Sequence, residues 1–174
     1  MTLSSRYLIV ELVTGNIGPV SRTAAQSIQP ELHRLMLERQ RYLSHVARRL
    51  GVTRTECDAV EELTQRGGVT PGLLGECLTL TSGSVSALLD RLELLGWAQR
   101  EPHPDDRRMV LVRLTAAGEA IAEREIGPLD LAVHNAAATL RSRERSVIER
   151  FLSKAADAAA ELVAAEHALD DEST

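Results

Sequence analysis

The stretch from Thr70 to Thr115 decides the fold: TPGLLGECLTLTSGSVSALLDRLELLGWAQREPHPDDRRMVLVRLT. It predicts a short helix that begins at the cap Thr70-Pro71, a tight turn at 78–80 and a second helix over 81–95. Two strands and a connecting loop rich in Pro, Asp and Arg follow: Trp97–Glu101, Met109–Leu114 and Pro102–Arg108. We therefore expect a mainly α-helical chain with one small β-hairpin, arranged as a winged helix-turn-helix.

The second helix of such a motif enters the major groove of DNA. Its leucines form one buried stripe, and the residues that face outward near its start are small: Ser82, Gly83, Ser86 and Ala87. A helix in the groove brings its backbone close to the base edges, where bulky side chains would obstruct it. Arg91, one turn further on, either contacts a phosphate or pairs with a carboxylate such as Asp90 or Glu93, and the spacing leaves both open.

The loop between the strands carries the charges that a DNA-binding wing needs. Prolines stiffen the loop, and Asp106 can accept from its own turn and hold an arginine in place. Arg107 and Arg108 lie near the tip, where an arginine suits the negative potential of a narrow minor groove. The alternative is an ordinary solvated turn. Five arginines and five carboxylates between positions 78 and 115 cancel, so binding would depend on placement rather than on gross charge.

Composition narrows the class of protein. The 174 residues are 44% hydrophobic and carry a net charge of −5, which does not fit a non-specific nucleic-acid coater. The sequence has no nucleophile–base pair, phosphate loop or metal-ligand spacing, so we expect no enzyme, no cofactor and no metal. It has no apolar run of membrane-spanning length and no signal-peptide pattern, so we expect a cytoplasmic protein without membrane contact.

Amphipathic helices flank the motif on both sides. Four more helices are predicted. Before the motif, one runs from Pro30 to Leu50, and the next begins at a Thr53–Glu56 capping box and ends at Gly67-Gly68. After the motif, one begins at Ala116 and kinks or divides at Gly127-Pro128, and the last is capped by Ser142. We divide the chain into an N-terminal extension with a dimerisation helix (1–50), the winged helix-turn-helix (51–115) and C-terminal dimerisation helices (116–174). One protomer offers no evident surface to cover both terminal apolar stripes, which predicts a homodimer.

The segments LLDRLELLGW (Leu88–Trp97) and PDDRRMVLVRLT (Pro104–Thr115) resemble the multiple-antibiotic-resistance regulator (MarR) family. The resemblance implies a homodimeric winged-helix transcription factor that binds a pseudo-palindromic operator in double-stranded DNA. Many members release DNA when a small phenolic or lipophilic ligand binds, or on oxidation. The resemblance also implies that Arg108 enters the minor groove, that Asp106 braces it, and that Ser82, Ser84, Ser86 and their neighbours face the major groove. Gly83 and Ala87 stand where many members carry Arg or Lys.

Ligands of this family usually sit where the dimerisation helices meet the winged helix. Here His33, Leu37, Gln40 and Cys57, with residues near Leu129, are the candidates for such a pocket. Because the chain has few aromatic residues, we expect an aliphatic pocket and a small lipophilic effector.

Cys57 and Cys77 both lie on apolar stripes, so we expect buried, unreactive thiols rather than redox sensors. The leading function is a ligand-released repressor. One alternative is a winged-helix protein-interaction or dimerisation module without sequence-specific DNA binding, and another is a thiol redox-sensing regulator.

Overall fold

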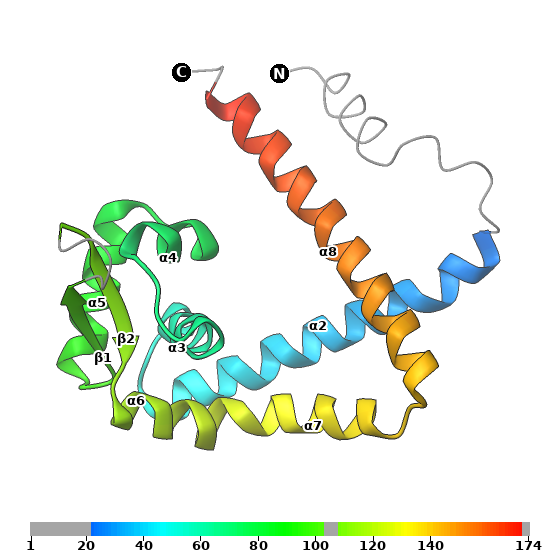
Figure 1. Ribbon diagram of the computed structural model, residues 1–174, viewed down its shortest axis with the longest axis horizontal. Helices are drawn as coiled ribbons and strands as arrows, with labels where there is room; N and C mark the ends of the chain where they lie inside the picture. The colour runs from blue at the N-terminus through cyan, green and yellow to red at the C-terminus, as the bar shows by residue number, and fades with distance from the viewer. Residues whose placement is uncertain (1–21, 103–107, 172–174) are drawn as a thin grey trace. The chain divides into compact units, whose positions relative to one another are not determined.

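A computed structural model describes residues 22–102 and 108–171 of the chain (Figure 1). The elements in chain order are α2 (Arg22–Leu50), α3 (Arg54–Arg66), α4 (Pro71–Leu78), α5 (Ser82–Leu94), β1 (Ala98–Pro102), β2 (Val110–Leu114), α6 (Ala116–Ile121), the π-helical turn η1 (Ala122–Ile126), α7 (Gly127–Ala138) and α8 (Ser142–Asp171). The predicted class, mainly α with one antiparallel hairpin, is confirmed.

Contacts divide the chain into two compact units. The winged-helix unit comprises residues 33–134, and the terminal unit comprises the described residues 22–32 and 135–171. The boundaries between these two units fall within α2 and α7. The domain boundaries predicted from sequence, 50/51 and 115/116, divide the chain by expected function and stay a prediction.

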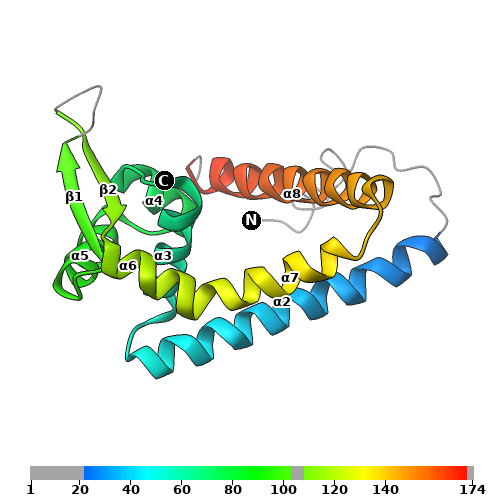
Figure 2. The ribbon, with the colours of Figure 1, turned by 60° about the horizontal axis from the view of Figure 1, so that its bottom comes forward.

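The core of the winged-helix unit lies between α3, α4, α5 and the hairpin. Its largest fully buried side chains come from α2, α3, α4, α5 and β2: Leu43, Val46, Val60, Leu63, Leu74, Leu89, Leu92 and Val112. Burying one such side chain favours folding by roughly 1.5–3 kcal/mol. Figure 2 shows the hairpin beside α5, so the same core that closes the unit also fixes the wing next to the second helix of the motif.

The caps predicted at Thr53 and Thr70 are present, and Thr81 and Thr115 cap the helices that follow them. The hydroxyls of Thr53, Thr70, Thr81 and Thr115 each accept from the backbone N–H three residues on. At Thr53 the capping box is complete, because the Glu56 carboxylate also accepts from the Thr53 N–H at 2.6 Å. Gly67 ends α3 with a φ of +68°, a left-handed conformation that favours glycine. These predicted ends are confirmed.

Two predicted helix starts are wrong. The helix α2 begins at Arg22, eight residues before Pro30, so Pro30 lies inside it rather than in its first turn. A proline inside a helix removes one hydrogen bond and its ring crowds the carbonyl four residues back, which favours a start at Pro30, but the residues before it are helical as well. Ser142 is the first residue of α8 rather than its cap. The Glu144 carboxylate accepts from the Arg141 N–H at 2.7 Å, so Arg141 takes the capping position.

The predicted break at Gly127-Pro128 takes the form of a π-helical turn just before it. Over η1 the Gly127 N–H bonds to the Ala122 carbonyl, five residues back. Pro128 has no N–H to offer, which favours a local change of helical pitch at this place. Two groups of α2 hold this turn: the Tyr42 hydroxyl donates to the Glu125 carbonyl at 2.7 Å, and Arg49 pairs with the Glu125 carboxylate.

Among residues 22–102 and 108–171, no single helix is long and apolar enough to cross a membrane. Within the same residues, α4 and α5 are long and apolar enough only when they are taken together, and a bend of 107° separates them.

Candidate nucleic-acid interface

The position of α5 is set by the turn that precedes it. Thr79 adopts a left-handed conformation with a φ of +54°, and the Leu80 N–H donates to the Gly75 carbonyl at 2.9 Å. Gly75 lies close to α5, because an added Cβ would stand 3.0 Å from a methyl group of Val85, which would have to shift by a few tenths of an ångström. The turn therefore holds α4 and α5 close together at their crossing.

One face of α5 packs into the core, and the opposite face is exposed. Val85, Leu88, Leu89 and Leu92 are buried. The residues predicted to face DNA are all exposed: Ser82, Gly83, Ser84, Ser86 and Ala87. A Cβ added at Gly83 would meet nothing within 4 Å, so this part of the helix surface is open. The exposed face is lined with small side chains, as a helix that approaches base edges requires.

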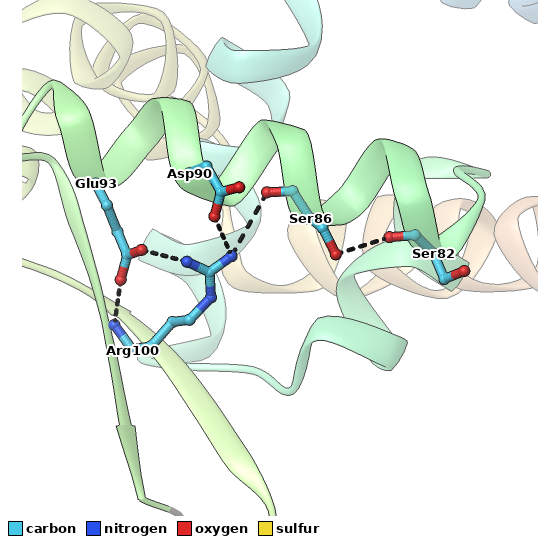
Figure 3. A network of polar contacts seen from close by, with 5 residues as sticks. All are labelled: Ser82, Ser86, Asp90, Glu93 and Arg100. Atoms are coloured by element: carbon cyan, nitrogen blue, oxygen red, sulfur yellow. Dashed lines mark hydrogen bonds and ion pairs between the residues drawn. The ribbon is translucent and has the colours of Figure 1, made fainter.

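Two of the three serines already make local bonds. The Ser84 and Thr81 hydroxyls lie 2.9 Å apart at the start of the helix. The Ser86 hydroxyl donates to the Ser82 carbonyl at 3.1 Å (Figure 3). Each hydroxyl keeps further acceptor capacity for an outside partner.

A network of polar contacts joins this helix to β1 (Figure 3). The Arg100 guanidinium pairs with Glu93 and, at 2.9 Å, with Asp90. It also lies 3.5 Å from the Ser86 carbonyl, and the Arg100 backbone N–H donates to Glu93 at 3.0 Å. The sequence analysis did not single out Arg100. The signal was present, because Arg100 follows buried Ala98 by two residues on a strand and therefore faces the helix side.

Arg91 has a carboxylate partner from another helix. Its Nε lies 3.6 Å from the buried carboxylate of Glu56 at the start of α3. The two partners considered from sequence, Asp90 and Glu93, pair with Arg100 instead. A phosphate contact by Arg91 stays a prediction.

The wing is a short two-stranded hairpin whose register pairs Ala98 with Leu114 and Pro102 with Val110. At its base Arg113 of β2 pairs with Glu101 of β1 and donates to the Gly67 carbonyl. Arg108 is exposed just before β2. Asp106 and Arg107 lie outside the described residues, so the predicted brace between Asp106 and Arg108 stays a prediction.

Three of the four predicted pocket residues lie together. His33, Leu37 and Gln40 line one hollow of about 570 Å³, which also receives side chains from α3. Leu129 lines a separate hollow of about 480 Å³. Cys57 lies instead in the core, 2% exposed, against Val46 and Ala47. No group of three His, Cys, Asp or Glu side chains in the described parts of the chain is placed to hold a metal ion.

The two cysteines differ in exposure. Burial, followed by the nearby charge of Asp58, raises the pKa of the Cys57 thiol to about 11. Cys77, which we expected to be buried, is exposed. The short helix α4 buries Leu74 and Gly75, and Cys77 lies on the neighbouring exposed stripe.

Comparison with known proteins identifies sequences that are similar to this chain. The family model for the MarR family matches residues 50–109. An HTH-type transcriptional regulator of Bacillus subtilis (strain 168), YcgE, is 38% identical over 112 residues, which are 64% of this chain and 72% of the relative. The multiple antibiotic resistance protein MarR of Salmonella typhimurium is 36% identical over 87 residues, 50% of this chain and 60% of that protein.

Solved structures of transcriptional regulators are also similar to this fold. The apo form of wild-type MarR from E. coli superimposes with a TM-score of 0.52 at 28% identity, covering 80% of this chain and 97% of that chain. The regulator Tm0710 from Thermotoga maritima gives 0.55 at 25% identity, covering 76% and 93%.

Proposed function

Since this chain belongs to the MarR family of transcriptional regulators, we propose that it is a homodimeric repressor that binds a pseudo-palindromic operator and leaves it when a small lipophilic ligand binds. Its relatives are named as regulators, and it is a regulator rather than an enzyme. The observation that carries the proposal is the exposed face of small residues on α5, held beside a hairpin with an exposed Arg108.

In this proposal α5 enters the major groove with Ser82, Gly83, Ser84, Ser86 and Ala87 toward the bases. Serine hydroxyls both donate and accept, so they suit phosphate oxygens and base edges alike. Arg108 of the wing enters the adjacent minor groove, where a guanidinium is attracted by the negative potential. We also include Asp106 and Arg107 among the proposed DNA-binding residues, and Arg91 either supports α5 through Glu56 or contacts a phosphate.

The terminal unit supports a dimer. Its helices carry exposed large apolar side chains: Ile28, Val147, Ile148, Phe151, Leu152 and Val163. Apolar side chains that repeat along one helix and remain exposed favour burial against a second copy of the chain. A two-fold dimer would place two α5 helices about one DNA turn apart, roughly 34 Å, as a palindromic operator requires.

The hollow lined by His33, Leu37 and Gln40 is the proposed effector site. A ligand that binds better to a dimer with a different helix separation would shift the population away from the DNA-binding form. A gel-shift assay with and without a panel of lipophilic compounds tests this part, because equal operator affinity with every compound would exclude such a switch.

Arg108→Ala tests the DNA-binding function directly. We expect the variant to remain dimeric and to lose operator binding, since one minor-groove contact is removed from each half-site. Arg41→Ala is the matched control, because Arg41 makes an exposed ion pair with Glu38 on α2. Unchanged DNA binding by Arg108→Ala would instead favour a protein-interaction module.

A further inference from the structure

We propose that Arg100 is a positioning residue for DNA recognition, which holds β1 of the wing against α5 and neutralises Asp90 and Glu93 beside the DNA-facing residues. This inference rests on the proposed DNA-binding function. It concerns a side chain that is turned toward α5 rather than toward the outer side of the wing (Figure 3).

The contacts of Arg100 cover two turns of α5. Its partners are the carbonyl of Ser86 and the carboxylates of Asp90 and Glu93, which stand four and three residues apart on one face of the helix. The planar guanidinium can bond several acceptors at once, which a lysine ammonium with its single nitrogen does less well. Arg100 therefore joins the strand to the helix at several points.

The backbone strengthens this connection. The Arg100 N–H donates to Glu93, and Arg100 stands opposite Val112 in the hairpin. The side-chain ion pairs and this backbone bond therefore act together to hold both strands of the wing beside α5. The angle between the wing and α5 sets where Arg108 meets the minor groove relative to the serines in the major groove.

Arg100 also reduces the negative charge on the predicted DNA-facing surface of α5. Ser82, Ser86, Asp90 and Glu93 lie along one side of α5, so the two carboxylates continue the predicted DNA-facing surface (Figure 3). The Asp90 side chain is 69% exposed, whereas that of Arg100 is 30% exposed. Without Arg100, two negative charges would stand near DNA phosphates and repel them. Arg100 cancels part of this repulsion without occupying the groove itself.

Arg100→Gln is the first test. The probe is the duplex that the wild-type protein selects from a random-sequence library, and the readout is the dissociation constant as a function of salt. We expect about tenfold weaker binding, because two ion pairs are lost and two carboxylates are exposed to the phosphates. Arg66→Gln is the matched control, since it removes an equal charge from an ion pair with Glu62 on α3. Equal affinities of the two variants would overturn the proposal.

A rescue experiment separates positioning from a direct phosphate contact. In the triple variant Arg100→Gln, Asp90→Asn and Glu93→Gln the repulsive charges are gone but the side-chain connection between β1 and α5 is still missing, so we expect only part of the lost affinity to return. Complete recovery would show that Arg100 acts through its charge alone, which contradicts the positioning role. If Arg100 itself bound a phosphate, the slope of log affinity against log salt would fall in magnitude by about 0.9 for each chain of the dimer, in Arg100→Gln and in the triple variant alike. That result would contradict the proposal.

A further variant keeps Arg100 and removes only its partners. With Asp90→Asn and Glu93→Gln the guanidinium becomes available to phosphates, so binding to random duplexes should tighten and depend more steeply on salt. Unchanged binding would show that the carboxylates do not restrain Arg100, which contradicts the proposal. Failure of the wild-type protein to bind any duplex would instead contradict the DNA-binding function itself, so the two failures are distinguishable.

Discussion

At the residue scale, burial separates the two thiols. Cys57 is packed in the core with a raised pKa, and Cys77 lies exposed on α4. Because the thiolate is the reactive form, we expect iodoacetamide at pH 8 to label Cys77 and to leave Cys57 unmodified until the protein unfolds. Peptide mass spectrometry with and without denaturant measures this. Labelling of both cysteines at similar rates in the folded protein would contradict the assignment of Cys57 to the core.

Glu125 is the residue whose protonation should couple to stability. The hydrogen bond from Arg124 is the main cause that lowers its pKa, and the charges of Arg49 and Arg124 act in the same direction against desolvation. A lowered pKa in the folded state means that the stabilisation is complete above the ordinary glutamate pKa, about 4.3. It is lost as the pH falls through the lower folded-state value.

We therefore expect Glu125→Gln to destabilise the protein at pH 7 and to differ less from wild type below the ordinary glutamate range. Urea unfolding at the two pH values measures the difference. The control is Glu119→Gln, which changes an exposed carboxylate on α6. A difference between Glu125→Gln and wild type that does not depend on pH would refute the linkage.

At the element scale, α6 depends on a close approach to the start of the wing. A Cβ added at Gly118 would lie 2.0 Å from the Trp97 carbonyl oxygen, so the helix or the strand would have to move. We expect Gly118→Ala to lower the free energy of unfolding by about 1–3 kcal/mol. Gly72→Ala on α4 is the control, since its Cβ would meet nothing within 4 Å. A Gly118→Ala variant as stable as the control would disprove this contact.

The elements that could be predicted from sequence are those governed by local chemistry. Threonine caps, the left-handed Gly67 and the leucine stripe of α5 follow from neighbouring residues, and they are confirmed. The start of α2 was misjudged because Pro30 is compatible both with a first turn and with a helix interior that gives up one bond. The contacts of η1 with Tyr42 and Arg49 could not be predicted, because these residues are distant in sequence.

In the candidate site, too, the features that follow from local sequence could be predicted, and those that depend on distant residues could not. The exposed small residues of α5 followed from the helical period, because the leucines on the other side had to be buried. The strand alternation of β1 indicates that Arg100 faces the helix side, but its partners Asp90 and Glu93 belong to a different element and do not follow from that alternation. The Glu56 partner of Arg91 could not be predicted for the same reason, since Glu56 belongs to α3.

At the scale of the whole molecule, the proposed dimer should depend on α8. Phe151→Glu places a charge among the exposed apolar side chains of that helix, next to Leu152. We expect the variant to be monomeric at concentrations where the wild type is dimeric and to lose operator affinity at least about tenfold. Light scattering after size exclusion measures the mass. Lys154→Glu on the same helix is the control, and a dimeric Phe151→Glu variant would argue against this interface.

The most direct test of the account is the structure of the protein–DNA complex in solution, measured as stoichiometry and hydroxyl-radical footprint on the selected duplex. We predict two chains per duplex and two protected patches about one helical turn apart, and we predict that both patches disappear in Arg108→Ala because that variant loses operator binding. One chain per duplex with a single protected patch, or no complex even at low salt, would contradict it.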